Sequence, residues 1–244
     1  MSILLVFIIG LIPAIICYFL LKKRNPDMPG YPETCKKAVI YGMISTVPIF
    51  LAATVFYVIA VLLKMRDGDP LILDAFHTFI MAALVEEAGK FIFFRRLIRK
   101  TDCAYSWLDL TAFMILVGLG FEILESLVLS VTMGPGQSLV RGVTMMHGAF
   151  GFIMGYYYAK ALRTGKKGYF VLSFMIPYLY HAIYDFTLSE RLNEMFDWIA
   201  FIPVTLAALS VVIWIIVIVF FRKRKNDEYY NEPLRPEAAA CVPE

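Results

Sequence analysis

The sequence predicts an all-α polytopic membrane protein, and three observations support this. Hydrophobic residues make up 60% of its 244 residues, whereas soluble domains contain about 45–50%. Apolar runs of about 20 residues, the length that spans a bilayer as a helix, recur along the whole chain. The loops between these runs are too short to hold a second soluble domain. We therefore expect one transmembrane domain over residues 1–225, followed by a short tail.

About seven apolar segments are expected to form transmembrane helices. They cover residues 2–21, 38–63, 72–94, 108–133, 138–162, 169–188 and 197–221. The first segment lacks a basic n-region and a recognisable cleavage site, so we expect a retained helix and not a signal peptide. Pro48 should kink the second. The polar tail, residues 226–244, contains three prolines and is expected to be disordered.

The basic residues predict how the chain crosses the membrane. Of the 23 Lys and Arg residues, 18 lie at the ends of the first, third, fifth and seventh segments or in the stretches that directly follow them, including the tail. Positive loops face the cytoplasm, so the N-terminus should lie outside and the C-terminus inside. Each basic cluster adjoins a membrane exit, which argues against nucleic-acid binding. The four cysteines form no CxxC pair, and we expect free thiols.

The third segment carries three ionisable residues within an apolar run: Glu86, Glu87 and Lys90. A carboxylate at the centre of a bilayer costs at least about 2.5 kcal/mol. Lys90 can reach either glutamate on a helix, but it neutralises only one of them. The second glutamate needs a proton, a metal or another partner. His77, nearer the outer end, is interpreted as an interfacial polar residue.

The fourth segment places Glu122 and Glu125 on one helical face, one turn after two glycines that allow a close helix approach. The fifth segment contains His147 among small residues. The sixth contains His181 and Asp185, four residues apart, so that the carboxylate can hold the imidazole or join it in binding water or a metal.

Similar depths suggest that these groups converge. Glu125, His147 and His181 lie about 7–9 residues from the outer ends of their segments, or roughly 10–14 Å. Glu86 lies slightly deeper. We therefore expect the third to sixth segments to form a catalytic bundle around one polar, water-filled cavity that opens towards the outer leaflet.

The ordered motifs Glu86-Glu87-x-x-Lys90, Phe121-x-x-x-Glu125, His147 and His181-x-x-x-Asp185 resemble those of the PrsW family of intramembrane proteases, relatives of the CAAX prenyl proteases and Abi proteins. The resemblance covers about residues 72–188, the expected catalytic core. It implies cleavage of a single-span protein, such as an anti-sigma factor in a stress response, near its extracytoplasmic boundary. It also implies a prokaryotic plasma membrane.

The resemblance implies that Glu86 is the general base on water, and Glu87 would assist it or pair with Lys90. Peptide hydrolysis also needs oxyanion stabilisation and a proton for the leaving amine. His147 or His181 would polarise the water or stabilise the oxyanion.

We expect the remaining carboxyl groups, on Asp185, Glu125 and Glu122, to assist the reaction. Asp185 would orient His181, and Glu125 would share a proton or hold the water. Glu122 is a supporting residue, interpreted as a protonated hydrogen-bonding group.

The same residues could bind Zn²⁺ through His147, His181 and one or both of Glu86 and Glu125. No HExxH motif is present. Only two of these ligands are histidines, and Asp185 can be engaged in its interaction with His181 and so not bind a metal. The sequence therefore favours a glutamate-activated water without a metal.

Two other functions fit part of the pattern. A proton-coupled transporter would use the Glu and His residues as a relay, but the segments show no two-fold repeat. A non-catalytic scaffold would not explain why so many ionisable groups converge. We therefore expect an intramembrane peptidase.

Overall fold

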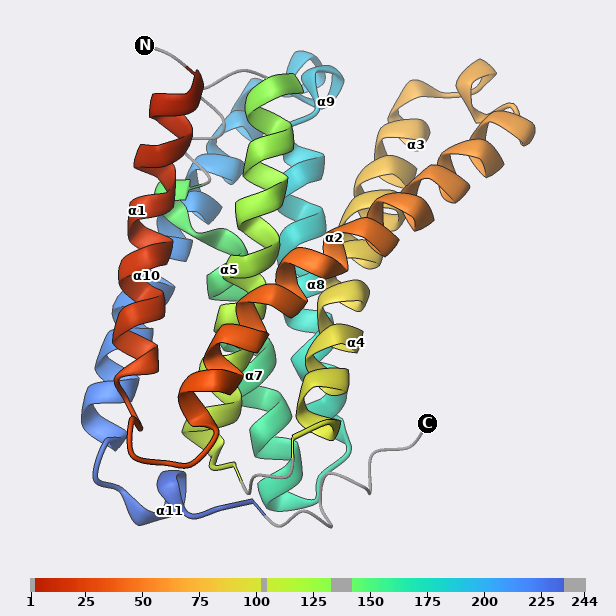
Figure 1. Ribbon diagram of the computed structural model, residues 1–244. Coiled ribbons are helices and arrows are strands. Elements are labelled where there is room, and N and C mark those ends of the chain that lie inside the picture. The colour runs from red at the N-terminus through yellow and green to blue at the C-terminus, as the bar shows by residue number, and fades with distance from the viewer. Residues whose placement is uncertain (1–2, 102–104, 133–141, 235–244) are drawn as a thin grey trace.

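The structure is a computed structural model that describes residues 3–101, 105–132 and 142–234. Six long helices make up most of the described residues, arranged as in Figure 1. They are α1 (Ile3–Lys22), α2 (Tyr31–Leu62), α5 (Trp107–Thr132), α7 (Met146–Thr164), α8 (Gly168–Thr187) and α10 (Phe201–Arg224). The described residues form no β-strand, and one isolated bridge joins Ser106 to Pro233.

The third apolar segment is a composite helix. It consists of α3 (Pro70–Ala75), the π-helix η2 (Phe76–Leu84) and α4 (Val85–Arg99). The expected single α-helix over 72–94 was therefore wrong in its middle part. Helix α2 and this composite helix form a hairpin, joined through η1 (Met65–Asp67), and only its tip leans away from the rest of the bundle (Figure 1).

Helix α5 is the centre of the bundle, because it is buried on all sides along most of its length. Glycines at its contacts let neighbouring backbones approach closely, a common device in membranes. A Cβ added at Gly120 would lie 2.1 Å from the carbonyl oxygen of Val39 on α2. A Cβ added at Gly151 on α7 would lie 2.5 Å from the carbonyl oxygen of Met114. Helices α2 and α7 therefore pack directly against α5.

The fifth segment does not form one helix over 138–162. Residues 133–141 lie outside the described part of the chain, residues 142–144 are helical, and Met145 adopts a left-handed conformation with φ 45°. Helix α7 then starts at Met146. His147 consequently lies in the first turn of a helix that begins inside the bundle.

Part of the tail is folded, so the expected disorder from residue 226 was wrong for residues 226–234. Here α11 (Glu228–Asn231) follows α10. The Arg163 guanidinium donates to the Glu232 carboxylate at 3.0 Å, and Leu234 is buried. Trp107 packs against the rings of Tyr229 and Tyr230. Residues 235–244 lie outside the described residues.

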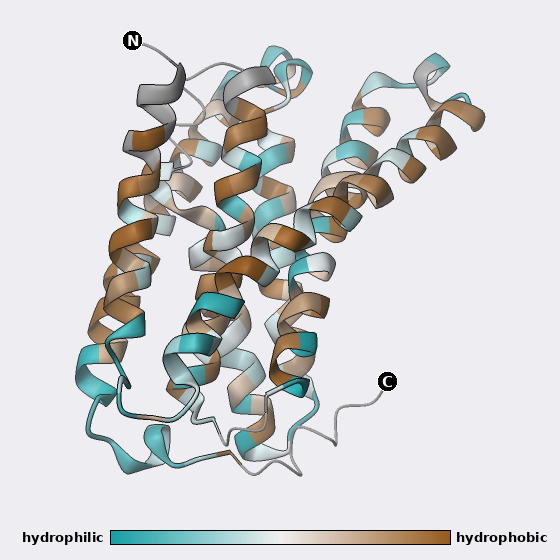
Figure 2. Cartoon of the chain, viewed as in Figure 1, coloured by the Kyte–Doolittle hydropathy of each residue, from teal (hydrophilic) through white to brown (hydrophobic). Residues whose placement is uncertain are grey.

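Figure 2 shows hydrophilic residues gathered at the end of the bundle where α11 lies, and hydrophobic residues along the helices above it. All four basic clusters adjoin helix ends on this side. This arrangement agrees with the predicted cytoplasmic face, although the orientation in the membrane stays a prediction.

Among the described residues, three helices are long and apolar enough to cross a membrane. They span Tyr31–Leu62, Trp107–Leu129 and Asp197–Arg224, the last including η3 (Asp197–Ala200). A shorter apolar helix covers Leu11–Lys22. The chain is thus an all-α protein with membrane-spanning helices, and the count of seven spans stays a prediction. The short helix α9 (Glu190–Met195) links α8 to η3.

Candidate active site

Four buried polar side chains from three helices contact one another within the bundle. The Lys90 ammonium donates to Glu87 Oε1 at 2.6 Å and lies 2.7 Å from Nδ1 of His147. His181 Nδ1 lies 2.9 Å from the same Glu87 oxygen. Each of the four residues is about 1% exposed. The Glu87 and Lys90 side chains of α4 therefore contact both imidazole rings.

Three more carboxylates face the other side of these rings. Glu125 Oε2 lies 2.7 Å from His147 Nε2, and Asp185 Oδ2 lies 3.2 Å from His181 Nε2. Glu86 Oε2 lies between the rings, 4.0 Å from His147 Nε2 and 3.8 Å from His181 Nε2. The Glu86 side chain is 15% exposed and that of Asp185 is 19% exposed. These two residues therefore form the more accessible side of the cluster.

Two aromatic rings fix the imidazole planes. The Phe150 ring is stacked on His181, with centroids 5.4 Å apart, and meets His147 edge to face at 5.7 Å. Phe121 packs edge to face on His147 at 4.9 Å, and its ring lies 4.5 Å from the Lys90 ammonium. No role for Phe150 was expected from the sequence. The available signal was its position, one helical turn after His147.

Local backbone features place these side chains. The π-helix η2 ends at Leu84, and α4 follows directly from Val85, so that Glu86 and Glu87 lie in the first turn of α4. π-Helical insertions in α-helices occur frequently at functional sites. A Cβ added at Gly118 would lie 2.1 Å from the carbonyl oxygen of His147. Glycine at this position therefore lets the His147 backbone lie directly against α5.

The structure brings together six residues that the sequence predicts for the site: Glu86, Glu87, Glu125, His147, His181 and Asp185. Lys90 joins them, while Glu122 is buried on α5 beside Phe121. The proximity of Glu86 and His181 is as expected. The catalytic roles of these residues stay predictions.

A pocket of about 320 Å³ lies at the end of the bundle opposite α11 (Figure 1), and Asp185 is one of its lining residues. Its lining includes Asp74, His77 and Ser189, and Ser189 donates to the Asp74 carboxylate at 2.7 Å. His77 is thus an exposed residue of this pocket and lies apart from the buried cluster. The expected water-filled cavity enclosing all the site residues stays a prediction.

The composition of the cluster suits a cation. Glu86, Glu87, Glu125 and Asp185 supply four carboxyl groups, and Lys90 supplies one ammonium group. Protons, a metal ion or charged imidazoles must balance the excess.

One atom each from Glu86, His147 and His181 lies within 4.8 Å of the other two. Nitrogen or oxygen ligands lie about 2.0–2.2 Å from Zn²⁺, and tetrahedral geometry places two of them about 3.3–3.6 Å apart. The two Glu86–imidazole distances, 3.8 and 4.0 Å, are slightly longer than this. Glu86 is thus a candidate third ligand beside the two histidines, and the shortage of histidines no longer argues against a metal.

Comparisons with known proteins agree with this donor set. A family model described as "PrsW family intramembrane metalloprotease" matches residues 32–221. A relative in Oceanobacillus iheyensis, named Protease PrsW, is 29% identical over 65% of this chain and 70% of its own length. Proteins of the same name in Clostridioides difficile and Bacillus subtilis are 22% identical over 92% and 91%, and 25% identical over 77% and 84%, respectively. No solved structure matches this chain.

Proposed function

Because the chain belongs to the PrsW family of intramembrane metalloproteases and is a peptidase, we propose that Glu86, His147 and His181 form its hydrolytic centre. The observation that carries this proposal is the convergence of their three donor atoms within 4.8 Å. Family membership also decides between the two activities considered from the sequence, because it favours a peptidase over a proton-coupled transporter.

The residues present fit a divalent metal such as Zn²⁺, which would be held by Glu86, His147 and His181. When bound, the ion would polarise the scissile carbonyl and activate a water molecule. The protein would keep the imidazoles in the required orientation. Metal-binding histidines usually donate their other N–H to a carboxylate. Glu87 is placed to accept from Nδ1 of His181 in this way, which leaves Nε2 directed towards Glu86.

Glu86 and Glu125 are the proposed proton-handling groups. Because the Lys90 ammonium donates to His147 Nδ1, the proton on Nε2 is directed at Glu125 Oε2, 2.7 Å away. Ligation of Nε2 would displace this proton, and Glu125 is placed to accept it. Glu86 faces both imidazoles and is one of the two more accessible carboxyl groups, which supports its role as ligand or base. Glu87 accepts a hydrogen bond from Lys90 and contacts His181 Nδ1, which supports a role in positioning these two side chains.

The proposed substrate is a single-span membrane protein of the anti-sigma-factor type, cut near its extracytoplasmic boundary. Support for this location comes from the pocket at Asp185, which lies at the end opposite the basic clusters. A helical peptide bond is shielded by its own hydrogen bonds, so the substrate must unwind locally before it reaches the cluster.

The test uses purified full-length protein in lipid vesicles with a single-span test substrate. We expect the wild type to cleave it and Glu86→Ala to be inactive. The wild type should contain about one equivalent of zinc. His181→Ala should lose the metal, whereas His77→Ala, a matched change at an exposed histidine, should retain it. Equal metal content in these two variants would refute the proposed metal site, and cleavage by Glu86→Ala would refute the proposed centre.

A further inference from the structure

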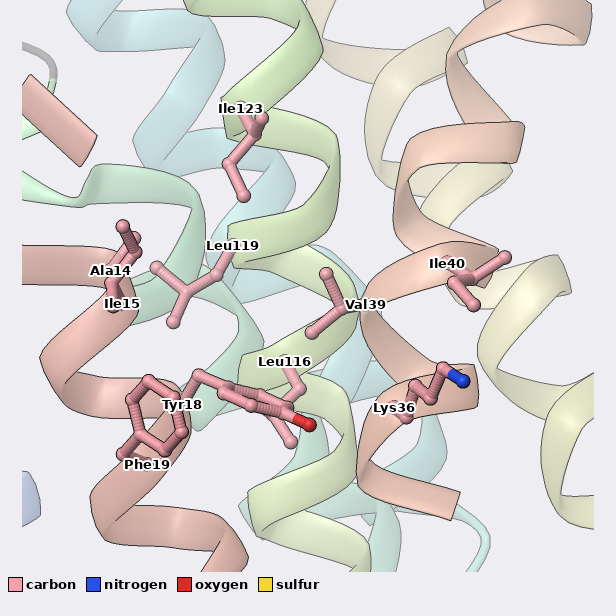
Figure 3. Close-up of a pocket in the computed structure, with 10 residues that line it drawn as sticks. All are labelled: Ala14, Ile15, Tyr18, Phe19, Lys36, Val39, Ile40, Leu116, Leu119 and Ile123. Atoms are coloured by element: carbon pink, nitrogen blue, oxygen red, sulfur yellow. The ribbon is translucent and has the colours of Figure 1, made fainter. Parts of the chain in front are cut away.

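A narrow apolar groove lies between α1 and α2, on the far side of α5 from the carboxylate cluster. Its volume is about 320 Å³, and its lining includes Ala14, Tyr18, Lys36, Val39, Leu116 and Ile123. Figure 3 shows α1 and α2 as the two walls and the α5 side chains Leu116, Leu119 and Ile123 between them. We call this feature the α1–α2 groove.

The groove exists because α1 buries only a thin stripe. In the described part of α1, the buried residues are Ala14, Cys17 and Leu21, spaced three and four residues apart. The neighbouring Ile15 and Phe19 remain about half exposed. Two members of the stripe are small, so they cannot fill the space between α1 and the much larger α2–α5 surface.

The size of the groove indicates an extended hydrocarbon chain as its occupant. From Leu116 to Ile123 the groove follows eight residues of α5, a rise of about 10 Å. The groove offers about 320 Å³, near the lower end of the range for pockets that hold one small ligand. A single acyl chain belongs to this size class.

The polar groups at one end of the groove indicate an anionic headgroup. Lys36 is exposed in the second turn of α2, and the Lys22 ammonium lies 5.7 Å from the Tyr18 ring centroid. Figure 3 shows the Tyr18 hydroxyl directed towards α2 at this end. Lysine near a membrane surface attracts anionic lipids, and its long stem lets the ammonium reach the headgroup level.

We propose that the α1–α2 groove binds one acyl chain of an anionic phospholipid, with its phosphate held by Lys36 and Lys22 on the predicted cytoplasmic side. The lipid would act as a spacer that joins α1 to the rest of the bundle. This binding site lies outside the hydrolytic centre and does not depend on the proposed function.

The test is photolabelling of the purified full-length protein in phosphatidylcholine vesicles without substrate. The probe is a small fraction of phosphatidylglycerol that carries a photoactivatable group on one acyl chain. We expect labelled peptides from α1, α2 and α5 at the groove. Lys36→Gln should lower labelling about five-fold. Lys37→Gln, an exposed neighbour that does not line the groove, should leave it unchanged.

A second pair of variants tests the acyl-chain position without changing charge. Ile40→Trp should fill the groove and reduce labelling, whereas Ile44→Trp, at an exposed position outside its lining, should not. Equal labelling by a phosphatidylcholine probe, or equal effects within either pair, would overturn the proposal. Displacement of the probe by a single-span substrate peptide would also overturn it and would make the groove a substrate site. Failure here would leave the peptidase measurements untouched.

Discussion

Replacement of Gly118 by alanine tests whether the close approach of α7 to α5 sets the activity. The new Cβ would lie 2.1 Å from the carbonyl oxygen of His147, whereas ordinary contacts begin at about 3.4 Å. The obstructing atom belongs to the backbone and cannot move aside by a side-chain rotation. The first turn of α7 must therefore move away from α5 by about 1.3 Å, and the His147 ring must move with it.

The expected effect is large on activity and moderate on stability. A displacement of about 1 Å at a catalytic group can cost about a hundred-fold in rate. Overpacking of this kind destabilises a fold by about 1–3 kcal/mol. We therefore expect Gly118→Ala to remain folded, with peptidase activity about a hundred-fold lower and a reduced zinc content.

Cleavage of a single-span substrate in vesicles, with the melting temperature of the same preparation, measures both effects. Gly168→Ala is the matched control, because no atom lies within 4 Å of its added Cβ. This control should retain normal activity. A folded Gly118→Ala protein with full activity and full zinc content would show that the position of His147 does not limit catalysis, and the reasoning from the glycine contact would be wrong.

Three further outcomes are expected. Lys90→Met leaves the Glu87 carboxylate buried without its cation and should lower the free energy of unfolding by about 3–5 kcal/mol. In a denaturation experiment, the double variant with Glu87→Gln should recover much of that loss. A double variant as unstable as Lys90→Met would count against the pairing. Truncation after Lys225 removes two rings that pack on Trp107 and should cost about 1–3 kcal/mol in thermal melting, whereas an unchanged melting temperature would argue against the docked tail. A reporter that works only in the cytoplasm should be active when fused after Lys225. Activity of a periplasm-specific reporter at the same position would reverse the predicted topology.

The convergence of the site residues could be predicted from the sequence because lipid is a poor solvent for charge. Glu86, Glu125 and His147 each need polar partners in a membrane, and residues of the same depth on neighbouring helices can supply them. The pairing of Glu87 with Lys90 follows from their spacing on a helix. Residue type, spacing and depth are enough for both predictions, without knowledge of the backbone path.

Other features could not be predicted because no residue type marks them. The π-helix over residues 76–84 changes the hydrogen-bond register without a proline or glycine in that stretch. The break at Met145 places a positive φ at a residue that rarely adopts one. The tail has a disorder-like composition, yet Arg163 and Trp107 hold it against the bundle. Each of these depends on tertiary contacts.

The start of α7 inside the bundle has an electrostatic consequence. The N-terminus of an α-helix carries about half a positive charge, from backbone groups that cannot lose a proton. His147 is the second residue of α7, and its ring contacts Glu125. A permanent positive potential therefore lies beside the carboxylates, worth up to about 2 kcal/mol in a partly buried setting. Such a potential would help the newly inserted chain keep its acidic residues together before any metal ion arrives.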